Sequence, residues 1–321
     1  MNFINNSKNN FVKQKTLKNN ILFSGVGLHT GKAVSMSIEP SEPNTGIVFE
    51  RTDLYENNMI EAIIDNVDET CLCTKITNKH GVSVSTIEHL MAAFHGLEID
   101  NVKVKINSDE LPALDGSSYV YVKKIIDSGV KVQSVNRKCI KILKKVKFCI
   151  NDRYISAEPS SELSLNISID YPNTIIGDSQ FTYNHSQSNF LAQLSEARTF
   201  TLLEDVEKMR LTGYAMGGSI NNAIVVDKYK ILNSDGLRFE KEFVKHKALD
   251  CIGDFYLLGM PLIGTICTFA PGHKINQMFV KEILSNKENY SIEDLEIKYS
   301  HDEYINLLNF NNLSQKEINV A

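Results

Sequence analysis

The sequence has no Cys-x-x-C pair, no excess of positive charge and no long uninterrupted hydrophobic run. Its six cysteines therefore predict neither a zinc ribbon nor a thioredoxin-like motif, and nothing in their spacing indicates a disulfide framework. The formal net charge of −5 argues against a general nucleic-acid binder, which would usually be basic. We therefore expect a reducing, cytoplasmic compartment and no nucleic-acid partner.

Membrane-spanning segments are not indicated either. The longest stretch without a charged residue, 255–272, is interrupted by Gly259, Pro261 and Gly264, and it predicts a helix end, a turn and a buried strand. Residues 1–20 are rich in Asn and Lys and lack the apolar core of a secretory signal. A hydrophobic content of 42% and a charged content of 23% are typical of a soluble globular protein.

The most informative stretch is 243–255, in which His246, Asp250 and Asp254 are spaced four apart. Residues four apart share one face of a helix, and imidazole with carboxylate suits a cation such as Zn²⁺. Such a pair is often only a surface ion pair. Here the surrounding residues are apolar, and no basic residue follows four positions after Asp254. A cation would relieve the repulsion between the stacked carboxylates, so we predict a metal-binding helix.

Such a site needs a third ligand, and Glu88 and His89 are the best donors elsewhere. Ser85 and Glu88 fit a capping box, which predicts a helix that begins at Ser85. Adjacent helical residues diverge by about 100°. His89 could therefore bind the metal while Glu88 contacts the attacking water, an arrangement suited to metal-assisted hydrolysis.

The chain of 321 residues is long enough for two domains. Alternating apolar residues predict strands at 101–106, 163–170 and 262–269, and helical patterns fall at 119–128, 188–197 and 201–210. Each half then has strands, a helix with a metal-ligand-type His, a glycine and a strand, which hints at duplicated domains that share a site. We predict a disordered tail at 1–14, an α+β domain at 15–135, a second α+β domain at 136–310 and a tail at 311–321. No heptad pattern demands a dimer, so we expect a monomer.

Eight motifs resemble, in the same order, those of the zinc-dependent UDP-3-O-acyl-N-acetylglucosamine deacetylases of lipid A biosynthesis. They lie at residues 25–31, 85–90, 99–101, 114–117, 197–200, 235–239, 246–254 and 272–276. The resemblance implies an α+β fold with two similar domains, each a layered β/α sandwich, in which the helices pack between two sheets. It also implies removal of the N-acetyl group from UDP-3-O-(3-hydroxyacyl)-N-acetylglucosamine with release of acetate, the committed step of lipid A biosynthesis.

The resemblance further implies particular residues. The metal ligands would be His89, His246 and Asp250, which suit Zn²⁺ and also accept Fe²⁺. The residues that act on the reacting groups would be Glu88 as general base, His273 as general acid, Asp254 as the carboxylate that orients His273, and Thr199 as an oxyanion donor. The substrate would be bound by Lys247 near the phosphates, Tyr171 beneath the uracil, and Phe200 with the insert at about 200–226 along an acyl-chain passage.

Two other classes stay open. A metal amidohydrolase acting on a soluble sugar or nucleotide would have a polar groove where an acylated substrate needs an apolar passage along Phe200 and 211–226. A non-catalytic α+β binding module would have a closed metal site or none. His29, at the tip of the turn 25–31, fits a turn or substrate-contacting role better than a metal-binding one.

Overall fold

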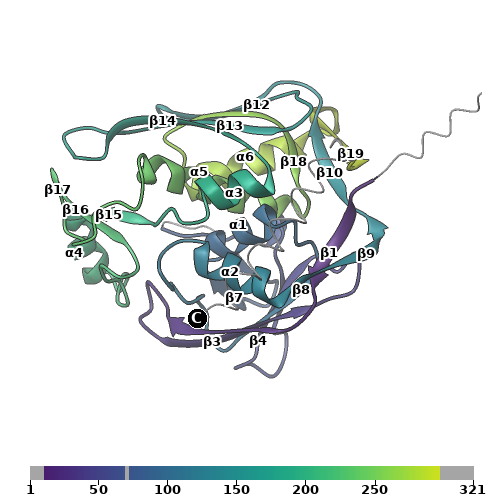
Figure 1. The fold of residues 1–321 in the computed structure, drawn as a ribbon, viewed down its shortest axis with the longest axis horizontal. Helices are drawn as coiled ribbons and strands as arrows, with labels where there is room; N and C mark the ends of the chain where they lie inside the picture. Colours follow the sequence, from purple (N-terminus) through teal and green to yellow (C-terminus); the bar gives the residue numbers. More distant parts are fainter. Residues whose placement is uncertain (1–10, 69–71, 297–321) are drawn as a thin grey trace, which may run out of the picture.

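The structure, a computed structural model, describes residues 11–68 and 72–296. Its helices form a middle layer between two sheets, one along the top and one along the bottom of Figure 1. This layer contains α1 (Glu88–Gly96), α2 (Tyr119–Ser128), α3 (Gln187–Gln193), α5 (Glu242–Phe255) and α6 (His273–Ser285). The layered α+β fold implied by the resemblance is therefore confirmed.

The lower sheet has five strands in the order β2-β3-β8-β4-β5. They are β2 (Ile21–Val26), β3 (Ala33–Pro40), β4 (Ile47–Arg51), β5 (Met59–Glu61) and β8 (Val102–Ile106). β8 pairs in parallel with β4 and antiparallel with β3. Buried Val102, Val104 and Ile106 alternate along β8 with the more exposed Lys103 and Lys105, which gives the strand one apolar face.

The upper sheet has seven strands and is built around β18 (Leu262–Phe269). The others are β10 (Lys138–Ile142), β11 (Val146–Ile150), β12 (Arg153–Glu158), β13 (Leu163–Tyr171), β14 (Gly177–Asn184) and β19 (Tyr290–Asp294). β18 pairs in parallel with β10 and β13 and antiparallel with β12. The run 262–269 is thus a strand, as predicted. No helix in 11–68 or 72–296 is long and apolar enough to cross a membrane.

Smaller elements complete the fold. β1 (Lys13–Leu17) pairs with β9 (Val130–Asn136), and β6 (Lys75–Thr77) pairs with β7 (Ser83–Ser85). A three-stranded sheet contains β15 (Phe200–Leu202), β16 (Ile224–Asp227) and β17 (Lys230–Ile231), with α4 (Leu203–Leu211) beside it. Figure 1 shows these last elements at one end of the molecule; they contain the segment 200–226, which is called the insert below. Short 3₁₀ segments lie at η1 (Ile64–Asn66), η2 (Tyr256–Leu258) and η3 (Lys287–Asn289).

Two boundaries differ clearly from the predictions. The helix predicted to begin at Ser85 begins at Glu88 as α1, because Ser85 belongs to β7 and its hydroxyl donates to the Asp109 carbonyl. The predicted capping box is therefore wrong. Of the predicted tail 1–14 only 11–14 is described, and Lys13 and Gln14 begin β1. The tail 311–321 lies outside the described residues, and the division into domains at 15–135 and 136–310 stays a prediction.

Candidate active site

Helices α1 and α5 lie side by side in the middle layer and bring three ligand-type side chains together (Figure 1). The ligand atoms of His89, His246 and Asp250 all lie within 4.8 Å of one another. Asp250 Oδ1 is 3.3 Å from His246 Nε2 and 3.6 Å from His89 Nε2. This oxygen is buried and has no hydrogen-bond partner among the described residues. A buried carboxylate oxygen between two imidazole nitrogens fits a bound cation, and the His₂Asp donor set suits Zn²⁺.

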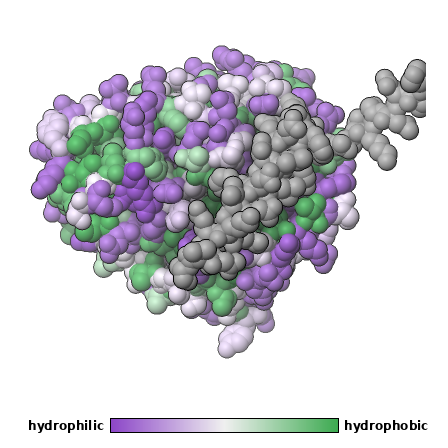
Figure 2. Space-filling model, viewed as in Figure 1, coloured by the Kyte–Doolittle hydropathy of each residue, from purple (hydrophilic) through white to green (hydrophobic). Residues whose placement is uncertain are grey.

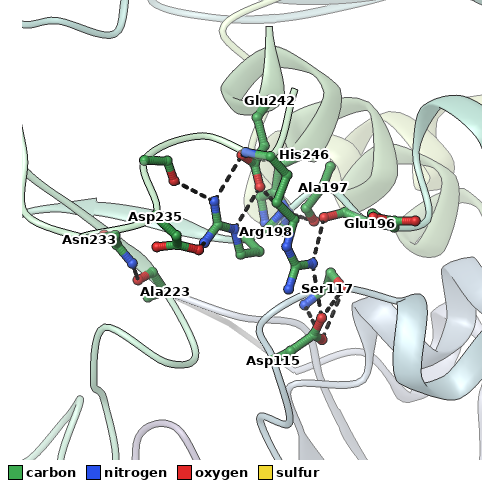
Figure 3. A network of polar contacts seen from close by, with 12 residues as sticks. Asp115, Ser117, Glu196, Ala197, Arg198, Ala223, Asn233, Asp235, Glu242 and His246 are labelled. Carbon is green, nitrogen blue, oxygen red and sulfur yellow. Dashed lines mark hydrogen bonds and ion pairs between the residues drawn. The ribbon is translucent and has the colours of Figure 1, made fainter. Parts of the chain in front are cut away.

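The loop that precedes β15 fixes the ring of His246. Its Nδ1 donates a hydrogen bond to the Ala197 carbonyl at 3.0 Å (Figure 3). This bond leaves the Nε2 lone pair facing Asp250. Burial lowers the pKa of His246 to about 3, so the ring is neutral, as a ligand must be. Arg198, which follows Ala197 in the loop, forms a buried ion pair of 2.8 Å with Glu242 at the start of α5. The loop and the helix that carries His246 are therefore held together.

A second cluster of polar side chains, centred on His273, lies next to the three ligand-type residues. His273, the first residue of α6, places Nδ1 2.9 Å from Asp254 Oδ2 and Nε2 3.7 Å from Glu88 Oε1. The Thr74 backbone N–H donates to Glu88 Oε2 at 3.0 Å, and the Thr74 hydroxyl donates to Asp254 Oδ1 at 2.5 Å. Asn276 donates to Asp254 Oδ2 at 2.7 Å. The positive partner of Asp254 is thus His273, and the prediction that a metal balances Asp254 is wrong because α6 lies beside α5.

These contacts shift the proton affinities of the group. Burial raises the pKa of Glu88, and His273 and His89 partly offset that rise. Burial acts to lower the pKa of His273, but the carboxylates of Asp254 and Glu88 raise it to about 10. For Asp250, burial acts upward, yet His246 and Lys247 hold its pKa well below the usual range. The group therefore places a buried carboxyl group of raised pKa beside a protonated imidazole.

One cavity of about 550 Å³ is lined by the three ligand-type residues together with Glu88 and His273. Nine of the ten predicted site residues line it, and Asp254 lies behind His273. The insert contributes a largely apolar wall with Leu203, Val206, Met209, Ile220 and Val225. Figure 2 shows apolar surface at the left end of the molecule, where Figure 1 places α4 and β15–β17.

The predicted substrate-binding residues form one aromatic and basic corner of the cavity. The Phe200 ring lies 5.5 Å from Tyr171 and 5.0 Å from Phe243. Lys247 Nζ lies 5.4 Å from the centre of the Phe200 ring and 3.1 Å from Asp250 Oδ2. Thr199 also lines the cavity, and its backbone N–H donates to the Gly116 carbonyl at 2.8 Å.

The sequence analysis missed Thr74, Asn276 and Arg153 as members of the site. Thr74 precedes β6 without any local pattern that marks it. Asn276 lies three residues after His273, so helical spacing in the motif 272–276 could have placed it on the face of α6 that carries His273. Arg153, at the start of β12, lines the same cavity as Lys247 and adds a second cation to it.

Comparison with known proteins identifies the family. The LpxC family model, described as UDP-3-O-acyl N-acetylglycosamine deacetylase, matches residues 14–285. A UDP-3-O-acyl-N-acetylglucosamine deacetylase of Haemophilus influenzae (strain PittEE) is 39% identical over 289 residues, which cover 89% of this chain and 95% of that protein. The protein of the same name from a Nitratiruptor species is 41% identical over 281 residues, which cover 88% of this chain and 93% of that protein. The chain therefore belongs to the UDP-3-O-acyl N-acetylglycosamine deacetylase family and is an amide hydrolase.

Proposed function

We propose that the protein removes the N-acetyl group from UDP-3-O-(3-hydroxyacyl)-N-acetylglucosamine, releasing acetate, as the committed step of lipid A biosynthesis. The observation that carries this proposal is the meeting of His89, His246 and Asp250 with Glu88 and His273 at one cavity. A ligand triad, a base and an acid in reach of the same space are the parts that hydrolysis of an amide needs.

His89, His246 and Asp250 would hold Zn²⁺, with Fe²⁺ as the alternative that the same donors accept. When bound, such a cation polarises the amide carbonyl and lowers the pKa of water to roughly 7. Support for the ligand set comes from the buried, unpartnered Oδ1 of Asp250 and from the neutral, backbone-oriented His246.

Glu88 is the general base in this proposal. The Thr74 N–H holds Oε2, and Oε1, which lies 3.7 Å from His273 Nε2, would take the proton from the attacking water. The raised pKa of the buried carboxyl group makes it a better proton acceptor than an exposed Glu.

His273 is the general acid. The amine product cannot leave as an anion, so a proton must reach its nitrogen. His273 is protonated at neutral pH because its pKa is raised to about 10, and the hydrogen bond from Nδ1 to Asp254 leaves the Nε2 proton directed at the cavity. We propose that Nε2 delivers this proton while Asp254 orients the ring.

The remaining residues bind substrate. We propose that the Thr199 hydroxyl donates to the oxyanion that develops on the carbonyl oxygen. Lys247 would contact the diphosphate, and Tyr171 would lie against the uracil. Phe200 and the insert would line the acyl chain, which is supported by the apolar side chains along that wall. The same apolar wall argues against a substrate that is a soluble sugar or nucleotide.

The test is an assay of acetate release from the UDP-linked acylated sugar, with metal-depleted protein and with protein reloaded with Zn²⁺ or Fe²⁺. The proposal expects turnover that is lost on depletion and restored by metal. Equal turnover of an unacylated UDP-N-acetylglucosamine would instead favour the soluble-substrate hydrolase.

The five described cysteines are all free. A cytoplasmic location and a monomeric state stay predictions.

A further inference from the structure

Glu110 is a buried carboxylate outside the catalytic group, with an exposed fraction of 0%. Its Oε1 accepts from the His29 backbone N–H at 2.7 Å and from the Thr86 hydroxyl at 3.1 Å. Its Oε2 accepts from the Thr30 backbone N–H at 2.8 Å and from the Thr30 hydroxyl at 2.7 Å. Four donors therefore stabilise one buried negative charge, and hydrogen bonds to a charged acceptor are about twice as strong as neutral ones.

One of these bonds ends at the start of α1. Thr86 has a φ of 60°, in the left-handed region that a β-branched residue rarely adopts. It is followed by Ile87 and by Glu88. The bond from the Thr86 hydroxyl to Glu110 therefore ties the carboxylate to a strained residue two positions before Glu88, at the start of α1.

The other bonds end at the turn 27–31, which is enclosed on both sides. A Cβ at Gly27 would lie 2.4 Å from Glu110 Oε2, so only glycine fits against the carboxylate. On the opposite side, the Met216 N–H donates to the His29 carbonyl at 3.1 Å and the Gly217 N–H donates to the Leu28 carbonyl at 3.0 Å. These two donors belong to the segment 211–226 of the insert, so the turn joins Glu110 to the insert.

His29 shows what this turn contributes to the cavity. Its ring lines the cavity and lies 5.6 Å, edge to face, from Tyr214 of the same insert segment. The position of the ring is set by the His29 backbone. Its N–H donates a hydrogen bond to Glu110, and its carbonyl accepts one from the Met216 N–H.

We propose that Glu110 is a positioning residue, which fixes the turn 27–31, and through it the insert, relative to the start of α1. The inference rests on the proposed function, because the quantity that it controls is the fit of an acylated substrate between Glu88 and the insert. Without the carboxylate, the metal ligands and Glu88 stay in place, but the wall formed by the insert is no longer held at a fixed distance from them.

The test uses Glu110→Gln, which keeps the size of the side chain. An amide has one acceptor oxygen, so its NH₂ group must face one of the two donor pairs. Asp109→Asn is the matched control, because Asp109 is the neighbouring carboxylate and its side chain pairs with the exposed Lys32 at 3.0 Å. Thr30→Val is a milder second variant, which removes one hydroxyl donor to Glu110 and leaves the backbone donor.

Three quantities are measured: metal content, kcat and KM for UDP-linked substrates with long and with short acyl chains, and amide hydrogen exchange at 27–31 and 214–218. For Glu110→Gln we expect unchanged metal content, faster exchange in both segments, and a KM for the long-chain substrate raised about tenfold, as the loss of one charged hydrogen bond predicts. KM for the short-chain substrate should change much less. Thr30→Val should shift the same quantities in the same direction by less, and Asp109→Asn should leave them unchanged.

Unchanged exchange and an unchanged ratio of the two KM values in Glu110→Gln would overturn the proposal. An equal loss of activity on both substrates that follows a lower melting temperature would also overturn it, because that is the result of a merely structural residue. If the wild-type protein releases no acetate, the proposed function fails, and the exchange measurement still decides whether Glu110 holds the turn and the insert.

Discussion

Gly253 of α5 lies directly against the backbone carbonyl of Glu88 in α1: a Cβ at position 253 would stand 2.1 Å from that oxygen. Gly costs up to about 1 kcal/mol relative to Ala inside a helix. Here it allows two helices from distant parts of the sequence to approach until His89 of α1 meets His246 and Asp250 of α5. The geometry of the site therefore depends on the absence of one methyl group.

Gly253→Ala should separate α1 from α5, because backbone atoms cannot move aside as a flexible side chain does. We expect a lower metal content and a loss of about 3 kcal/mol in the free energy of unfolding. That loss is at the upper end of the range usual for substitutions that overpack a core. Denaturant unfolding and elemental analysis check both. Gly81→Ala, in the turn between β6 and β7, is the control for strain: its φ of 80° also disfavours alanine, but nothing lies within 4 Å of the added methyl group, so we expect lower stability without loss of metal. An equal effect of both substitutions on metal content would contradict this account.

Glu88→Gln should keep the metal and lower kcat by about 10² to 10⁴-fold, since an amide cannot accept the proton from water. The Thr74 N–H can still donate to the amide oxygen of the new side chain, so the fold should be unaffected. Steady-state kinetics with parallel metal analysis is the measurement. Turnover within a few fold of wild type would remove Glu88 from the base role.

Asp254→Asn should move the alkaline limb of the pH–rate profile to lower pH. Asp254 is the leading cause that raises the pKa of His273, and burial, which lowers it, remains in the variant. The acid form of His273 is then lost as pH rises through a lower pKa, and we expect a displacement of at least about one pH unit. Metal content should not change, because Asp254 is not among the three ligands. An alkaline limb that coincides with that of the wild type would show that Asp254 does not act through His273.

His185 gives a prediction about stability rather than activity. Burial lowers its pKa to about 4 from the ordinary value of 6.5, and its Nδ1 lies 2.9 Å from the Tyr183 hydroxyl. Between these values the unfolded chain binds a proton that the folded protein does not. The stabilising contribution is therefore complete above pH 6.5 and is lost as pH falls towards 4, by up to about 3 kcal/mol.

His185→Gln should therefore flatten the fall in the free energy of unfolding between pH 6.5 and pH 4. Chemical denaturation at several pH values in that range measures the slope. His80→Gln, at an exposed turn, serves as the control and should keep the wild-type slope. A variant slope identical to that of the wild type would assign the acid sensitivity to other groups.

The sequence predicted those parts of the site that depend on local spacing. His246 and Asp250 are one helical turn apart, so their shared face follows from the helix alone, and the strand 262–269 follows from its alternation. Asp254 shows the limit of this reasoning. Its place on the same face was correct, but only the packing of α6 against α5 could show that its partner is His273 and not a metal.

Contacts that no periodic pattern encodes were missed for the same reason. Thr74 lies in a loop and reaches both Glu88 and Asp254 only because the chain folds back between α1 and α5. The capping box at Ser85 was a correct local pattern overridden by strand pairing, since β7 pairs with β6 through Ser85. The close approach at Gly253 left one trace in the sequence, a glycine inside a helix, and the sequence analysis did not use it.

The central claim is that α1 and α5 together hold one catalytic cation. Elemental analysis of the purified wild-type protein beside His246→Ala and Asp250→Ala tests it most directly. The account predicts one zinc or iron per wild-type chain, a loss of most of that metal in either variant, and full retention in His273→Ala. A metal content that is the same in all four proteins would contradict it.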